Sequence, residues 1–196
     1  MDNSILSYNN EINRKKLHLL SLGLPVFYIL FPAKIYFFTL AVFISVLAID
    51  ILRIYKLYEF ESLKKVIRSY EKNTFMTATY LIMISTFIIF FFNKEIAIYS
   101  LIIASICDTS AAIYGIKYGK VKLLNCKSLE GSLLFILTGF ISILIAFFII
   151  DGNTSVALPL FAVIFASFIE HVTPGKYDNI TVPLSVALFL KLSLSI

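Results

Sequence analysis

Asp108 is an acidic residue at the end of a long apolar run, where a membrane helix would ordinarily carry no charge. It follows the apolar segment 96–107 and opens the stretch CDTSAAIYGIKYGKVKLLNCKSLEGS, residues 107–132. A charge at the centre of a bilayer costs roughly 2.5–3.5 kcal/mol on insertion scales, so acids in such places usually face a polar cavity and serve a function. We therefore expect Asp108 to belong to a functional site.

A second polar motif, Lys127-Ser128-Leu129-Glu130-Gly131, also precedes a long apolar run. Ser128 suits the N-cap of a helix, and Glu130 suits its first turn, where the helix dipole favours an acid. A helix N-terminus beside a lysine also binds anions well. A plain helix start and an anion site therefore fit this motif equally.

Near the N-terminus, Glu11, Arg14, Lys15 and His18 share one face of a helix, because they fall at i, i+3, i+4 and i+7. On its own, such a face is more often a basic anchor at the membrane surface. It also fits a clamp for phosphate groups, in which the acid holds the basic side chains in place.

The loop that follows Asp108 contains Gly115, Gly119 and Lys120. A Walker A loop has four residues between its glycines and Ser or Thr after its lysine. Here three residues separate the glycines and Val121 follows the lysine, so that motif is excluded. Small residues let a ligand or a second helix approach closely, and both a phosphate-binding loop and a helix contact remain open.

Other ionisable residues also stand at the ends of apolar runs. Asp50 and Arg53 can pair on one helix face, and a structural ion pair is the more common role for them. Glu170 ends another run, and helix capping does not explain it. Asp178 and Asn179 open the last run, where a capping role explains either residue.

The elements that must position these residues are membrane helices. Of the 196 residues, 59% are hydrophobic and only 15% are charged, and the mean hydropathy is +0.90. This composition predicts an all-α, polytopic integral membrane protein. About seven apolar segments are long enough to span a bilayer core of about 30 Å. These segments are 17–33, 35–55, 75–93, 96–115, 132–150, 154–170 and 179–195.

Basic residues indicate the orientation of these segments. All of the 17 Lys and Arg residues except Lys34, Lys94 and Lys191 fall on one side of this layout. Because Lys and Arg concentrate in cytoplasmic loops, we expect a cytoplasmic N-terminus in a cytoplasmic or inner membrane. The candidate residues then lie on the cytoplasmic side, and the net charge of +5 requires no nucleic-acid partner.

We expect one membrane-embedded domain over residues 1–196, with two cytoplasmic loops. The loop 116–131 would bind the nucleotide or phosphate ligand. The loop 56–73 has the pattern of an amphipathic helix lying in the membrane interface. The apolar residues on one face of that helix would be Leu57, Phe60, Leu63 and Ile67.

The run Asp108-Thr-Ser-Ala-Ala-x-x-x-Gly115-x-x-x-Gly119, followed by Lys127-Ser-x-Glu-Gly131, resembles the CTP-dependent lipid-alcohol kinases. That family includes dolichol kinase, phytol and farnesol kinases, and the fungal-type diacylglycerol kinase. The resemblance extends to Glu11-x-x-Arg-Lys-x-x-His18, to Glu170 and to Asp178-Asn-x-Thr-Val-Pro183, and so covers nearly the whole chain. Cys107 stands where the family usually has glycine, which keeps a small residue there.

The resemblance implies transfer of the γ-phosphoryl group of CTP to a membrane lipid alcohol, with Mg²⁺ as cofactor. The implied catalytic residues are Asp108, Lys127 and Asp178, and the implied metal ligands are Asp108, Glu170 and Asp178. The implied nucleotide and phosphate ligands are Arg14, Lys15, Gly115, Gly119, Lys120, Ser128, Glu130, Gly131 and Asn179. Glu11, His18 and Glu170 are implied to support the site, and we expect the pair Asp50 and Arg53, chosen from its helical spacing, to support it too. The lipid alcohol, the identity of the base and the oligomeric state stay open.

Two other functions also stay open. A CTP:phosphatidate cytidylyltransferase would use the same nucleotide, but the chain lacks the Lys-Asp-x-Gly and His-Gly-Gly signature of that enzyme. A transporter would tend to have acids at mid-membrane and paired broken helices. Here the acids gather at one face and the sequence has no visible internal repeat.

Overall fold

The computed structural model describes residues 3–58, 67–150, 155–175 and 177–194. Within these ranges the chain forms helices, short helical turns and loops, and no strand. One isolated antiparallel bridge joins Lys122 and Ser128. The prediction of an all-α fold is confirmed.

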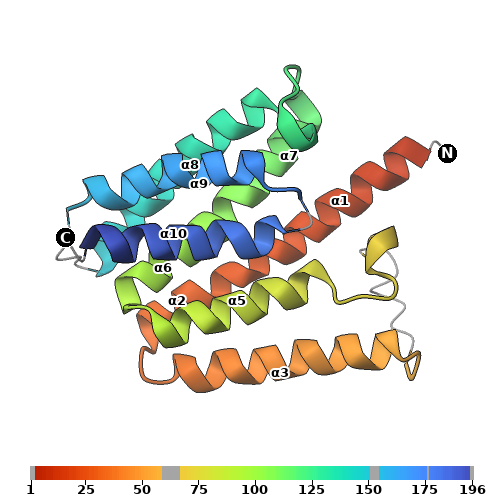
Figure 1. The fold of residues 1–196 in the computed structure, drawn as a ribbon, viewed down its shortest axis with the longest axis horizontal. Helices are drawn as coiled ribbons and strands as arrows, with labels where there is room; N and C mark the ends of the chain where they lie inside the picture. The colour runs from red at the N-terminus through yellow and green to blue at the C-terminus, as the bar shows by residue number, and fades with distance from the viewer. Residues whose placement is uncertain (1–2, 59–66, 151–154, 176, 195–196) are drawn as a thin grey trace.

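The N-terminal half forms three long rods at one side of the bundle (Figure 1). Helix α1 (Asn3–Leu19) continues through a 3₁₀ turn (Leu20–Leu22) into α2 (Gly23–Leu30). After a short turn, α3 (Ile35–Ile54) runs back in the opposite direction, and α5 (Thr77–Phe91) packs against it.

A long, mostly buried helix forms the centre of the bundle. It consists of α6 (Lys94–Ile102), a π-helical turn (Ile103–Cys107) and α7 (Asp108–Tyr118). A π turn inside an α-helix is rare and often marks a functional position. Here it directly precedes Asp108. Helices α8 (Leu129–Ile150), α9 (Ala157–Val172) and α10 (Asp178–Leu194) complete the bundle.

Within the described part of the chain, three helices are long and apolar enough to cross a membrane, namely 35–54, 94–118 and 129–150. Helices α5 and α9 are apolar but shorter. The outer helices expose large apolar side chains, such as Phe37 on α3 and Phe148 on α8, which are 81% and 77% exposed. These surfaces are consistent with a membrane protein, whereas the count of seven spans and the orientation stay predictions.

The two predicted cytoplasmic loops differ from expectation. Helix α7 continues to Tyr118 and α8 begins at Leu129, so the loop predicted over 116–131 is shorter than that range. Residues 59–66, in the middle of the amphipathic helix predicted over 56–73, lie outside the described residues. Residues Ser69–Glu71 form a 3₁₀ turn.

Candidate functional site

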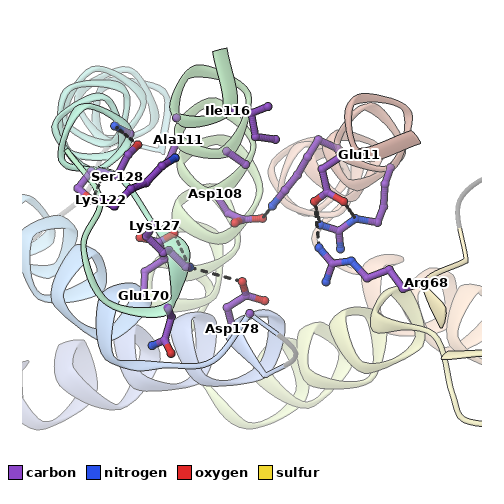
Figure 2. A pocket seen from close by; sticks show the side chains of 18 residues that line it. Glu11, Arg68, Asp108, Ala111, Ile116, Lys122, Lys127, Ser128, Glu170 and Asp178 are labelled. Carbon is purple, nitrogen blue, oxygen red and sulfur yellow. Dashed lines mark hydrogen bonds and ion pairs between the residues drawn. The ribbon is translucent and has the colours of Figure 1, made fainter. Parts of the chain in front are cut away.

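A polar cavity of about 350 Å³ lies at one end of the bundle, where α1, α7, α9, α10 and the start of α8 meet (Figure 2). It brings together most of the residues that the sequence singled out. The predicted site residues that line it are Glu11, Arg14, Lys15, Asp108, Gly115, Lys127, Ser128, Gly131, Glu170 and Asp178.

Asp108 faces this cavity and is paired with Lys15. The lysine Nζ donates a hydrogen bond to Asp108 Oδ2 at 2.5 Å, and both residues are buried. His18, one helical turn after Lys15, places its Nε2 3.6 Å from the same carboxylate oxygen and 3.2 Å from Asn179 Oδ1. Lys15 and His18, which the sequence placed on one face of α1, therefore compensate the negative charge of Asp108 on the central helix.

Lys127 forms the second charged centre of the cavity. Its Nζ lies 2.5 Å from Glu170 Oε1 and 3.6 Å from Asp178 Oδ2. Burial alone would lower the pKa of Lys127, but the charges of these two carboxylates raise it above its usual value, so the lysine stays charged. The lysine thus brings α9 and α10 to the same point.

Among the acids that line the cavity, Asp178 has the most distant ion-pair partner, since Lys127 Nζ lies 3.6 Å from its Oδ2. Burial raises its pKa to about 6, and the nearby charge of Asp108 acts in the same direction, while Lys15, Lys127 and Arg14 oppose the shift. A carboxylate of this kind gains from an added cation, because the cation would stabilise its charged form.

Two arginines meet on Glu11 at the rim of the cavity. Glu11 accepts hydrogen bonds from Arg14, on its own helix, and from Arg68 Nη2 at 2.9 Å. Burial would raise the pKa of Glu11, but the hydrogen bond and charge of Arg14 and the charge of Arg68 lower it overall. The acid therefore holds two guanidinium groups against the cavity, as the clamp interpretation of α1 requires (Figure 2).

Asp50 and Arg53 lie outside the cavity and hold the segment that carries Arg68 at its rim. Asp50 is fully buried, accepts a hydrogen bond from Arg53 Nη2 at 2.7 Å and also accepts from the backbone N–H of Met76 at 2.8 Å. Arg53 donates to three backbone carbonyls within 71–74, and Glu71 accepts from the Arg68 N–H at 2.8 Å. The pair is structural, and it fixes the segment that carries Arg68.

The loop between α7 and α8 is closed by its own hydrogen bonds. Ser128 Oγ accepts from the Gly131 N–H at 3.2 Å, which is the predicted N-cap of α8. The Glu130 carboxylate accepts from the Val121 N–H at 3.3 Å, and the Lys127 carbonyl accepts from the residue 123 N–H at 2.7 Å. Glu130 therefore holds the loop and is not part of the cavity lining.

Gly115 and Gly131 allow α7 and α8 to touch. A Cβ atom at Gly115 would lie 2.7 Å from Ser128 Oγ, and one at Gly131 would lie 2.9 Å from the carbonyl oxygen of Ala111. A Cβ at Gly119 would also lie 2.6 Å from Ser128. The geometry supports the helix-packing interpretation of these glycines, although Gly115 and Gly131 also form part of the cavity wall.

The structure places several other predicted residues outside the cavity lining. These are His18, Asp50, Arg53, Gly119, Lys120, Glu130 and Asn179. It adds residues that the sequence analysis did not single out, namely Arg68, Lys122, Asn125 and Ser132. Asn125 has a left-handed backbone (φ 54°) and donates to the His171 carbonyl at 3.0 Å, which turns the loop toward the cavity.

The acids of the cavity fit Mg²⁺ in a limited way. Within the described part of the chain, no group of three or more His, Cys, Asp or Glu side chains is arranged to hold a metal ion. Asp108 and Glu170 each have a lysine at 2.5 Å. Mg²⁺ is usually bound by one or two carboxylates together with substrate phosphates, and Asp178 suits that role best.

Comparisons with known proteins identify a relative over nearly the full length. No protein-family profile and no solved structure matches the chain. A protein of Rickettsia prowazekii (strain Madrid E), described as "Uncharacterized protein RP860", is 33% identical over 194 residues, which cover 92% of this chain and 93% of that protein. The chain belongs to the same family as this rickettsial protein.

Proposed function

We propose that this protein is a CTP-dependent kinase that transfers a phosphoryl group to a membrane lipid alcohol. One observation carries the proposal: cations and carboxylates from helices far apart in the sequence line a single cavity at one end of an apolar bundle. Phosphoryl transfer depends on positioning and charge neutralisation more than on covalent chemistry, and this cavity offers both.

The cations of the cavity would bind the phosphates of CTP. Arg68 approaches from one side and Lys127 from the other (Figure 2), and Arg14 and Lys15 of α1 line the same cavity. The volume of about 350 Å³ falls within the usual range for ligand pockets, about 300–1,000 Å³. The nucleoside would extend along the α7–α8 loop past Lys122, which is exposed at the rim.

The reaction forms one bond and breaks one. The hydroxyl oxygen of the lipid attacks the γ-phosphorus, the bond from that phosphorus to the β,γ-bridging oxygen breaks, and CDP leaves with that electron pair. Asp108 accepts the hydroxyl proton, and Lys15 and Lys127 stabilise the charge on the phosphoryl oxygens. Mg²⁺ held by Asp178 and the phosphates would supply further charge neutralisation.

We further propose that seven helices span the membrane and that the N-terminus and the cavity face the cytoplasm. The charge distribution supports this orientation, because the cavity gathers five Lys and Arg residues at one end of the bundle. CTP is a cytoplasmic metabolite, so a site at that face would receive nucleotide from water and alcohol from the bilayer.

Lys127→Met tests the role of the cavity directly. We expect a roughly 10²–10³-fold loss of phosphoryl transfer from CTP in purified protein, a loss typical of removing one group that stabilises the transition state. Lys117→Met is the matched control, since Lys117 is an exposed lysine of α7 that stacks on Tyr118 and does not line the cavity. Equal activity of the two variants would remove Lys127 from the mechanism.

A further inference from the structure

A second cavity, of about 600 Å³, lies on the other side of α1. It is a groove between the α1–α2 rod, α3 and α5, and its walls are mostly aliphatic. Representative lining residues are Leu17, Leu24, Val42, Val46 and Leu81. None of these residues belongs to the polar cavity described above.

The groove has the length of one leaflet. It runs along the α1–α2 rod from Arg14 to Leu24, and a helix rises 1.5 Å per residue, so it extends for about 15 Å. The hydrocarbon core of a bilayer is about 30 Å thick. Leu20 and Phe38 on its edges are 72% and 39% exposed, so its side faces outward between α1 and α3.

Its polar end adjoins the polar cavity. Arg14 lines both cavities. His18 lines the groove, and its Nε2 lies 3.6 Å from Asp108 Oδ2 in the polar cavity. A group at this end of the groove would therefore lie beside the acid that we assign as proton acceptor.

The polar groups at this end already satisfy one another. Glu71 accepts hydrogen bonds from the backbone and hydroxyl of Thr77 at 2.8 and 2.7 Å. Asn179 contacts His18 at 3.2 Å and donates to the Thr77 carbonyl at 3.3 Å. Arg14 is paired with an acid of its own helix. Apart from Arg14, which also lines the polar cavity, these residues offer a charged head group no uncompensated partner, whereas a single hydroxyl needs only one or two hydrogen bonds.

We propose that this groove binds the tail of the acceptor, and that the acceptor is a single-chain lipid alcohol with its hydroxyl at His18. The inference rests on the proposed function and narrows its substrate class. A water molecule occupies roughly 30 Å³ in the liquid, and a methylene group is of similar size, so 600 Å³ holds about twenty carbon atoms. One prenyl or alkyl chain fits within this space, whereas the two acyl chains of diacylglycerol would exceed it and extend out of its open side.

Photolabelling tests the groove without requiring activity. The probe is a farnesol analogue with a diazirine near its tail, applied to the purified full-length protein in lipid nanodiscs. We expect mass spectrometry to place the label on α3 and α2, near Val42, Val46 and Leu24. Excess farnesol should compete for labelling, and dioleoylglycerol should not.

A pair of tryptophan variants supplies the control. Val46→Trp fills the groove, and we expect at least tenfold weaker labelling with unchanged CTP binding. Ile44→Trp adds the same bulk on the opposite, lipid-facing side of α3, where Ile44 is 57% exposed, and should label normally. Equal labelling of both variants, or competition by dioleoylglycerol, would overturn the groove assignment even if the protein phosphorylates lipids. Labelling as expected without phosphorylation of any alcohol would instead overturn the proposed function and leave a lipid-binding groove.

Discussion

The ion pair between Lys15 and Asp108 gives a quantitative test of how the cavity is held together. Lys15→Met leaves a buried carboxylate without its nearest cation. Breaking one partner of a buried pair usually costs about 3–5 kcal/mol. We expect a cost of about 3 kcal/mol, at the lower end of that range, because His18 lies 3.6 Å from the same oxygen and offers partial compensation.

The double variant Lys15→Met/Asp108→Asn isolates the interaction free energy between these two residues from their interactions with other groups. Once both charges are gone, the uncompensated charge disappears, so the double variant should be more stable than Lys15→Met alone. We therefore expect a coupling free energy of about 2–3 kcal/mol in a double-mutant cycle, as is found for residues in direct contact. The assay is reversible unfolding of the purified protein in mixed micelles, with the free energy of unfolding extrapolated to zero denaturant.

Phosphoryl transfer in the Lys15→Met, Asp108→Asn and double variants of this cycle adds a second readout. All three should be inactive, because the cavity has lost a phosphate ligand, a proton acceptor or both. Strictly additive losses of stability would refute the reasoning, since they would mean that Lys15 and Asp108 do not interact in the folded protein.

Three further predictions concern the residues around the cavity. Gly131→Ala should cost about 1–3 kcal/mol of stability, because the new Cβ would lie 2.9 Å from a backbone carbonyl of α7, whereas Gly23→Ala has open space and should not destabilise. Asp50→Ala should cost about 3–5 kcal/mol by leaving Arg53 unpaired, and should also weaken CTP binding by releasing the arginine-bearing segment; calorimetry and nucleotide titration measure the two effects. Asp178 has a folded-state pKa raised to about 6, so its contribution to stability falls as pH rises from about 4 to 6 and stays low above that. Asp178→Asn should therefore be more stable than the wild type at pH 7.5, and an advantage that persists below pH 4 would contradict this account.

The sequence predicted which charged residues line the cavity better than it predicted the tertiary contacts that hold them in place. Charges are costly inside an apolar bundle, so Asp108 and Glu170 stood out at the ends of apolar runs, while Asp178 entered through the family resemblance. Helical spacing likewise predicted that Glu11, Arg14 and Lys15 would face one direction. These inferences depend only on local pattern and on the high cost of an isolated charge.

Other features depend on tertiary contacts that local pattern does not contain. Arg68 lies among several basic residues of the 56–73 segment, and only its contact with Glu11 distinguishes it. The roles of Gly115 and Gly131 were open in the sequence because small residues serve ligands and helix contacts equally, and the positions of their missing Cβ atoms favour the helix contact. The groove beside α1 has no sequence signature either, since its aliphatic residues resemble those of any membrane helix.

Transfer of label from CTP to lipid tests the central claim most directly. Purified protein in lipid nanodiscs would be supplied with Mg²⁺, farnesol and CTP labelled at either the γ or the α phosphate. We predict that γ label enters the lipid fraction, that α label does not, and that Asp108→Asn and Lys127→Met abolish the transfer. Entry of α label would instead indicate a cytidylyltransferase. No transfer of either label to farnesol or to a panel of other lipid alcohols would contradict the assignment as a lipid-alcohol kinase.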